Sequence, residues 1–358
     1  MRDALLELLR CPSCKLSLAL EDARRDGHIT AEASAAHITA GTLVCAKCTT
    51  RWPIVAGVPD FVGARGASDV EQTTGGFAVN WRRYSDVILA QPALNDELFR
   101  DWIQPLQPER FEDKNVIEAG CGMGRWLLAA APHAPRALVG FDYSEVVHAA
   151  YENTRHLKNV HVVRADIFRL PFKPAFDICY SIGVVHHTPN PEGAFEALLD
   201  AVVEEGALHV WVYGKENNDW IENVVSPLRR LVTSRLPDAA LYAISKVLTL
   251  QLALGALAYT KAFPEERSFS YDAYLRHLTK YPRPYLEHIV YDHLVPQLAQ
   301  YLPREELERW ATSRGLSYAL TARNNNSWRL IVARTPKALV SMTSSAVTDA
   351  RPVVGLAH

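Results

Sequence analysis

Residues 118–125 form a glycine-rich turn that is the first candidate for a binding site. The turn reads Glu118-Ala-Gly-Cys-Gly-Met-Gly-Arg125, and a short apolar run precedes it from Asn115. Glycine at alternate positions permits positive φ angles and leaves room for a ligand to lie against the main chain. The Ala/Leu-rich run over 126–131 predicts a helix, whose first N–H groups and dipole face the turn. The stretch therefore predicts a strand, a tight turn and a helix N-terminus that can hold a nucleotide.

The spacing of the glycines limits which ligand the turn binds. A dinucleotide-binding turn places its third glycine where Arg125 stands, and the Gly-Lys-Ser/Thr ending of a P-loop is absent. The turn instead resembles motif I of class I methyltransferases that depend on S-adenosylmethionine (SAM), a ligand without a pyrophosphate. The resemblance implies that the cofactor-binding residues of this turn are Glu118, Gly120, Cys121, Gly122 and Gly124.

A carboxylate at the end of the next apolar run extends the resemblance. Asp142 ends the run that begins at Ala137. An acid at this place accepts hydrogen bonds from both hydroxyls of a ribose. The alternative is that Asp142 caps the following helix, a role that Ser144 can share. We assign Asp142 to the ribose and include the adjacent Tyr143 among the cofactor-binding residues.

The third and fourth apolar runs supply the remaining cofactor contacts. Asp166 and Ile167 resemble motif III of the same family, which implies contacts with the adenine ring; a surface turn is the alternative. Ile182 ends the fourth run. Because these residues follow successive strands that alternate with helical patterns, we predict a parallel, doubly wound sheet. The resemblance implies an α/β fold with a Rossmann-like class I methyltransferase sheet, parallel except for a terminal antiparallel hairpin within 316–333.

Histidine is the natural proton acceptor for methyl transfer near neutral pH. The methyl group of a sulfonium is already electrophilic, so holding the acceptor in line and away from water supplies much of the rate. A hydroxyl or phenol acceptor must also lose a proton, and the candidate catalytic bases are His186, His187 and His293. The alternative for each is a structural role, because tandem histidines in this loop of the family also cap the cleft.

Four cysteines near the N-terminus predict a metal site. They form two C-x-x-C pairs, Cys11 with Cys14 and Cys45 with Cys48. Two such pairs make a closed site of four thiolates, the set that structural zinc prefers; a redox pair is usually single. Together with Thr50–Phe61, the pairs resemble the small zinc-ribbon proteins that partner and activate tRNA and translation-factor methyltransferases. The resemblance implies a module for stability and docking, without catalytic groups.

These patterns divide the chain into five segments. We predict a four-cysteine zinc ribbon over 1–62, a linker over 63–75, a SAM-binding methyltransferase domain over 76–215 and 303–335, a helical insertion over 216–302 and a disordered tail over 336–358. Trp81 and Tyr84, at the start of the methyltransferase domain, are expected to pack in the core rather than contact the ligand.

The insertion contains an apolar run, 241–259, that is about as long as a membrane span. Lys246, Thr249 and Gln251 interrupt the run, and no basic flank supports membrane insertion. We therefore predict no membrane span, and we interpret the run as a buried substrate lid or an oligomerisation helix.

Composition favours an ordinary globular enzyme. The 358 residues carry a net charge of -2, with 48% hydrophobic and 22% charged residues, so there is no global attraction to nucleic acid. Six cysteines without an export signal predict reduced thiols in the cytoplasm.

The predicted function is SAM-dependent methyl transfer, in biosynthesis, to oxygen, nitrogen or carbon of a small-molecule metabolite or natural product. The run Ile182-Gly-Val-Val-His186 stands where enzymes acting on planar nitrogens carry Asn/Asp-Pro-Pro-Tyr/Phe, so nucleic acid is not the expected partner. The alternative is an RNA or protein methyltransferase that uses the ribbon for docking. A SAM-binding scaffold without activity is a third hypothesis.

Overall fold

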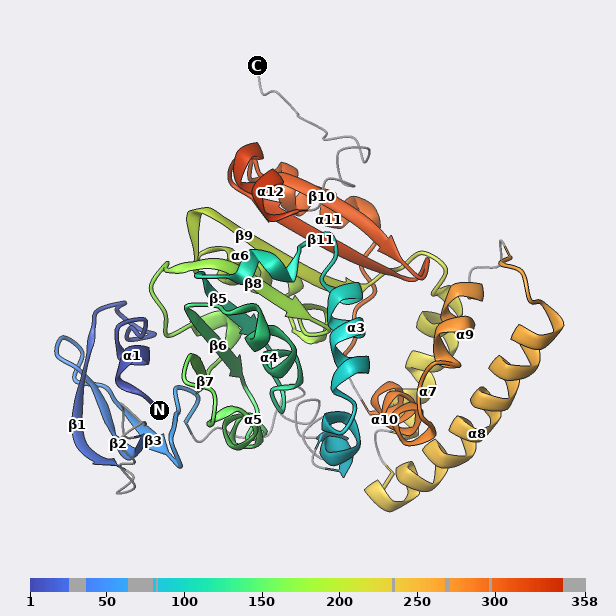
Figure 1. Ribbon diagram of the computed structural model, residues 1–358, viewed down its shortest axis with the longest axis horizontal. Helices are drawn as coiled ribbons and strands as arrows, with labels where there is room; N and C mark the ends of the chain where they lie inside the picture. Colours follow the sequence, from blue (N-terminus) through green and yellow to red (C-terminus); the bar gives the residue numbers. More distant parts are fainter. Residues whose placement is uncertain are drawn as a thin grey trace.

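The computed structural model describes residues 1–25, 37–63, 80–81, 83–233, 236–267, 271–295 and 298–343, without the side chain of Arg230 (Figure 1). The predicted linker beyond Gly63 and residues 344–358 of the predicted tail lie outside the described residues.

A sheet of seven strands occupies the centre of the molecule, in the order β10-β11-β9-β8-β5-β6-β7 (Figure 1). The strands are β5 Asn115–Ala119, β6 Ala137–Asp142, β7 Val160–Arg164, β8 Phe176–Ile182, β9 Val202–Tyr213, β10 Ser317–Arg323 and β11 Ser327–Ala333. Strands β5 to β9 pair in parallel, and β11 pairs antiparallel with both β9 and β10. The predicted fold class, a Rossmann-like sheet with a terminal antiparallel hairpin, is confirmed.

Helices cover both faces of this sheet because its strands are apolar on both sides. In β5, Val116 packs into the core on one face, while Ile117 and Ala119 pack into the core on the other. The first core is completed by α3 Pro92–Trp102, α4 Arg125–Ala130, α5 Val147–Thr154 and α12 Pro336–Met342, and the second by α6 Pro191–Leu199 and α11 Arg304–Thr312. Short helices η1 Pro108–Phe111, η2 Ala131–His133, η3 Ile167–Arg169 and η4 Val185–His187 connect these elements.

The N-terminal segment forms its own antiparallel sheet at the side of the large one (Figure 1). It consists of α1 Asp3–Leu6, β1 Leu18–Arg25, β2 Ile38–Cys45, β3 Arg51–Val55 and β4 Val58–Pro59.

This small sheet is docked onto edge strand β7 and helix α5. The amide of Phe61 donates to the carbonyl of Arg164 at 2.9 Å, and the Arg164 guanidinium pairs with Asp60 at 3.0 Å. His37 Nδ1 and the hydroxyl of Tyr151 in α5 lie 2.7 Å apart. Apolar side chains of the ribbon also belong to the same core as α6 and α11. The ribbon therefore shares a continuous interior with the large sheet.

The insertion consists of helices that stand together at one side of the large sheet (Figure 1). They are the π-helix η5 Ile221–Val225, α7 Ser226–Leu231, α8 Asp238–Ala262, α9 Asp272–Leu278 and α10 Arg283–Leu294. Helix α8 packs against α9 and α10. Tyr281, Tyr285 and Tyr291 of this segment are buried in the core that also contains α4.

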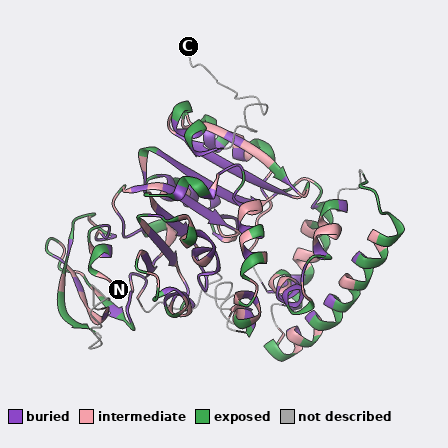
Figure 2. Cartoon of the chain, viewed as in Figure 1, coloured by how far each residue is buried: buried purple, intermediate pink, exposed green. Residues whose placement is uncertain are grey.

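Helix α8 differs from the prediction of a buried helix. Only 22% of its apolar window is buried, and Val247 and Leu254 are 59% and 58% exposed (Figure 2). Its polar residues Ser245 and Thr249 are buried instead, with hydroxyls that hydrogen-bond to carbonyls of the helix. By length and composition alone, α8 is sufficient to cross a membrane. The expectation of a buried lid helix is wrong, because only one face of α8, with Leu241, Ser245, Thr249 and Ala256, is buried against its neighbours. The alternative of an oligomerisation helix stays a prediction.

The predicted disorder of the tail is wrong for residues 336–342. This stretch forms α12, whose Ala338, Leu339 and Met342 are buried against the sheet. Thr335 caps the helix, since its side chain accepts a hydrogen bond from the amide of Ala338 at 3.1 Å. Pro336 at the first helical position and these apolar residues at helical spacing were the missed signals.

Candidate functional site

The glycine-rich turn lies at the C-terminal end of β5, next to the loop that follows β8. Gly120, Gly122 and Gly124 have φ angles of 75°, 52° and 85°. A Cβ on Gly120 would lie 2.2 Å from Cγ2 of Val184, so no larger residue fits there. In the sheet order, β5 is flanked by β8 on one side and β6 on the other. Successive strands are therefore added on one side of β5 and then on the other. Open α/β sheets bind ligands at such a reversal of strand order.

Asp142 lies at the end of β6 and is joined to the turn. Its carboxylate accepts hydrogen bonds from the Gly122 amide at 3.0 Å, and from the Ser144 amide and hydroxyl at 2.9 and 2.8 Å. The position of Asp142 is thus compatible with both predicted roles. The carboxylate organises the turn before the next helix, as a cap would, and it also lines the cavity in which a ribose could bind.

A cavity of about 1230 Å³ opens above these strand ends. It exceeds the roughly 300–1,000 Å³ typical of small-molecule sites, so it has room for a cofactor and an acceptor together. Ten predicted site residues line it: Gly120, Cys121, Gly122, Asp142, Tyr143, Asp166, Ile167, Ile182, His187 and His293. Trp81 lines it as well, while Tyr84 is buried in the core as expected of a packing residue.

Three predicted site residues do not line the cavity. Glu118 is 1% exposed beneath the turn, where it accepts a hydrogen bond from the Tyr180 hydroxyl at 3.2 Å, and burial raises the pKa of Glu118 well above its usual range. Gly124 faces Ala150 and Thr154 of α5. His186 is fully buried against Tyr213, with 4.0 Å between ring centroids. These residues support the walls of the cavity from behind.

The two histidines in the cavity are held in the neutral form. Nδ1 of His187 donates to the carbonyl of Leu298 at 2.6 Å, and burial lowers the pKa of His187 to about 4. His293 is exposed toward the cavity; the desolvating walls, and then the charge of Arg229, lower its pKa to about 4. Both imidazoles are therefore uncharged hydrogen-bonding groups at pH 7, and weak bases.

Asp292, the neighbour of His293 in the chain, is a functional candidate that was not predicted from the sequence. It lies on α10 and lines the cavity, with 27% of its side chain accessible. Desolvation by the surrounding walls raises the pKa of Asp292 to about 7, although hydrogen bonding by Asn80 opposes the shift. Asn80 Nδ2 donates to Oδ1 of Asp292 at 2.5 Å, and His288 Nε2 lies 3.5 Å from its other oxygen. Asn80 is 212 positions away, so spacing along the chain could not reveal the pair.

Two of the buried arginines that line the cavity, Arg125 and Arg229, have no carboxylate partner among the described residues. Arg125, directly after the turn, is 7% exposed and lies over the rings of Trp126 and Tyr285 at 3.7 and 5.2 Å. Its Nε has no hydrogen-bond partner among the described residues. Arg229 lies on α7, within the insertion, and is 4% exposed. The sequence signal for Arg125 was present, because it follows the last glycine of the turn.

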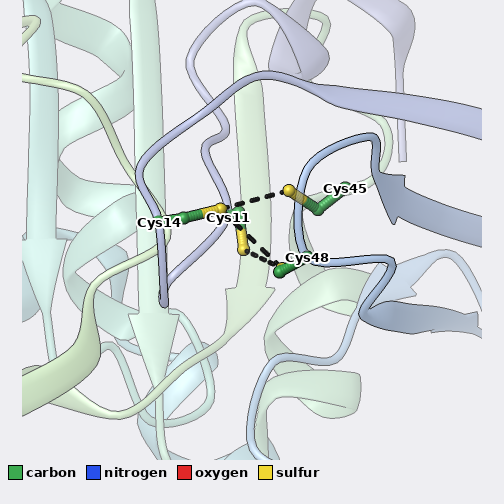
Figure 3. A group of neighbouring side chains, drawn as sticks. All are labelled: Cys11, Cys14, Cys45 and Cys48. Atoms are coloured by element: carbon green, nitrogen blue, oxygen red, sulfur yellow. Dashed lines mark hydrogen bonds between the residues drawn. The ribbon is translucent and has the colours of Figure 1, made fainter.

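The four predicted metal ligands converge on one point. Cys11 and Cys14 lie on the segment between α1 and β1, Cys45 ends β2 and Cys48 lies in the turn after it, and the two pairs face each other (Figure 3). The sulfurs of Cys14 and Cys45 are 3.2 Å apart, those of Cys11 and Cys48 3.5 Å, and all four lie within 4.8 Å. Tetrahedral ligands at about 2.3 Å from a zinc ion are about 3.8 Å from each other, so these cysteines form a cluster able to hold such an ion.

The fold, the glycine turn and the strand-end acids define a class of protein, the class I SAM-dependent methyltransferases. The chain belongs to the family described as "Methyltransferase domain", which matches residues 93–320. A second family, "Trm112p-like protein", matches residues 2–57 and thus the ribbon. The predicted enzyme class and the resemblance of the N-terminal segment are confirmed.

Curated relatives of this chain are named tRNA U34 carboxymethyltransferase. The protein from Psychromonas ingrahamii is 33% identical over 29% of this chain and 33% of its own length. That from Pseudoalteromonas atlantica is 26% identical over 32% and 38%, and that from Helicobacter pylori 30% identical over 27% and 40%. The chain thus matches 33–40% of the length of these relatives. Among solved structures, the DhpI-SAH complex is 15% identical over 76% of this chain and all of that one, with a TM-score of 0.44.

These relatives contradict two predictions. The prediction of a small-molecule acceptor and the prediction that nucleic acid is an unlikely partner are both wrong, because the relatives are named for tRNA and the ribbon matches the Trm112p-like family. The net charge of the whole chain was a poor guide to the acceptor, because it averages over all 358 residues and does not report the charge of the binding surface. The alternative, an RNA methyltransferase, is the better-supported reading.

Proposed function

We propose that this protein transfers a methyl group from SAM to an RNA, with a tRNA nucleotide as the acceptor. One observation carries the proposal: the cofactor turn opens into a 1230 Å³ cavity whose far wall is aromatic. Tyr213 and Tyr301 stack there with 5.5 Å between centroids and 18° between planes, and Trp211 meets Tyr213 edge to face. Aromatic walls of this kind stack extruded bases. Among acceptors with planar rings, we choose RNA because the curated relatives are named for tRNA.

The residues around the turn fit SAM. Gly120 and Gly122 line the cavity, and their positive φ angles give the turn the shape that brings its main chain to the strand ends. Asp142 would hold the ribose, with Tyr143 beside it, while Asp166 and Ile167 would hold the adenine and Ile182 the floor of the site. Arg125, a buried cation next to the turn, suits the carboxylate of the methionyl group. When bound, SAM supplies an electrophilic methyl group on a sulfonium.

The remaining cavity residues orient the acceptor and receive its proton. His187 and His293 are neutral, so they can direct the acceptor by hydrogen bonds without competing for the proton. His186 packs behind His187, with 4.2 Å between their rings, and acts as a positioning residue. Asp292 is the better base, because its pKa near 7 matches the working pH. Asn80 holds one of its oxygens, which fixes the carboxylate in place.

In this proposal the ribbon over 1–62 stabilises the catalytic unit, which comprises 76–215 and 303–335, and the insertion over 216–302 closes the acceptor side. Cys11, Cys14, Cys45 and Cys48 hold a structural zinc ion. A cytoplasmic location and a homo-oligomer formed through the insertion stay predictions.

The acceptor class is tested by incubating the protein with labelled SAM and either bulk tRNA or a small-metabolite extract from the same cells. We expect label in tRNA that ribonuclease releases, with a heat-inactivated sample as control. Label that enters only the metabolite extract would contradict the proposal.

The pH dependence of the transfer tests Asp292. A base must be deprotonated, and the folded-state pKa is raised to about 7, so the rate should fall as the pH drops through 7. Asp292→Asn should lower the rate about 10²- to 10⁴-fold and remove this limb of the profile. Asp86→Asn, the same change at an exposed aspartate, is the matched control. An unchanged acid limb in the Asp292→Asn protein would exclude Asp292 as the base.

Metal analysis tests the cysteine cluster. We expect one zinc ion per chain in the wild-type protein and loss of it in Cys45→Ser, with a lower melting temperature because the ribbon shares the core. Cys179→Ser, at a buried cysteine outside the cluster, should keep its zinc. Full zinc content in the Cys45→Ser protein would refute the four-thiolate site.

A further inference from the structure

Arg229 is a buried cation that has no anionic partner in the proposed methyl transfer. It is 4% exposed and lines the cavity. Its Nη2 donates to the Ser226 hydroxyl at 3.1 Å and to the Tyr301 hydroxyl at 3.4 Å, and it forms no ion pair with a carboxylate of the described residues. Hydroxyl groups satisfy some of the five guanidinium donors but leave its charge uncompensated.

The groups around Arg229 do not neutralise it either. Burial, and in addition the positive charge of Arg229, lowers the pKa of both His187 and His293, so both imidazoles are uncharged. Asp292 is hydrogen-bonded by Asn80 and lies 3.5 Å from His288. Asp101 pairs with Arg323, the third arginine of the cavity, at 2.6 Å. Arg125 and Arg229 therefore both line the cavity without a carboxylate partner among the described residues.

A charge this deeply buried is costly unless an opposite charge accompanies it. SAM carries one carboxylate, and Arg125 is the arginine next to the cofactor turn. A second anion must then reach Arg229 from the acceptor side. We propose that Arg229 binds an oxyanion carried by the acceptor, and so selects a nucleotide whose phosphate or attached carboxylate enters the cavity with the base.

The proposal rests on the proposed function for the identity of the acceptor, but not for the anion site itself. A guanidinium presents paired donors that match phosphate and carboxylate oxygens, so both sources share the chemistry. Stacking of the base on this aromatic pair would place its anionic substituent near Arg229, because the Tyr301 ring stacks on Tyr213 and the Tyr301 hydroxyl accepts a hydrogen bond from the guanidinium.

Binding of inorganic phosphate and of acetate to the protein saturated with S-adenosylhomocysteine tests the site. We expect one of these anions to bind and its affinity to fall at least about 10-fold in Arg229→Gln, the loss expected for a charged hydrogen bond. Preference for phosphate indicates the RNA backbone as the source, and preference for acetate indicates a carboxylate on the base. Binding of neither anion, or equal binding to the Arg229→Gln protein, would overturn the proposal.

Three controls make the result specific. Arg110→Gln makes the same change at an exposed arginine outside the cavity and should bind both anions as the wild type does. Affinity for S-adenosylhomocysteine and the melting temperature report whether Arg229→Gln is folded. If the Arg229→Gln protein is not folded, the Arg229→Lys variant replaces it, because lysine keeps the positive charge. Wild-type anion affinity in the Arg229→Lys protein would contradict a site that requires the guanidinium group. Anion binding that depends on Arg229, without label entering tRNA, would reject the proposed function alone.

Discussion

The steric fit between Gly120 and the loop after β8 is the constraint on which the site depends. With a φ of 75° and Val184 at 2.2 Å from a Cβ position, this residue must be glycine. The fit places two loops from neighbouring strands β5 and β8 together at the end of the sheet. It also brings the Gly122 amide to Asp142, so the carboxylate at the end of β6 is positioned by the same turn. The predicted cofactor-binding residues at the ends of three strands are thus held next to one another by one close backbone approach.

The distribution of charge in the cavity decides what the site can do beyond binding a cofactor. Burial keeps His187 and His293 neutral, brings the pKa of Asp292 to about 7, and leaves two arginines without carboxylate partners among the described residues. In a cavity of low dielectric constant, each of these groups interacts with a ligand more strongly than it would in water. The insertion contributes Arg229, Asp292 and His293 to the cavity, and in the proposed function these three residues form the acceptor side.

The parts of the site that are local in sequence could be predicted, and the parts that depend on long-range packing could not. The glycine turn, Asp142, Asp166 and the four cysteines each lie on one strand end or one loop, where residue type and spacing define the geometry. Glu118 and His186 belong to the same motifs, yet their side chains face the core, because the pleat and the loop direct them away from the ligand. The pair of Asn80 and Asp292 joins residues 212 positions apart. The exposure of α8 could not be predicted either, because which face of the helix is buried is set by its packing against α9 and α10.

Calorimetry with S-adenosylhomocysteine tests most directly the central claim, that this turn and Asp142 hold the cofactor. The wild-type protein should bind one equivalent. Asp142→Ala should lower the affinity about 100-fold, because two hydrogen bonds to a charged carboxylate are lost. Asp113→Ala, at an exposed aspartate outside the cavity, controls for loss of a charge, and the melting temperature of each variant controls for folding. Equal affinity of the folded Asp142→Ala protein and the wild type would contradict the assignment of the cofactor site.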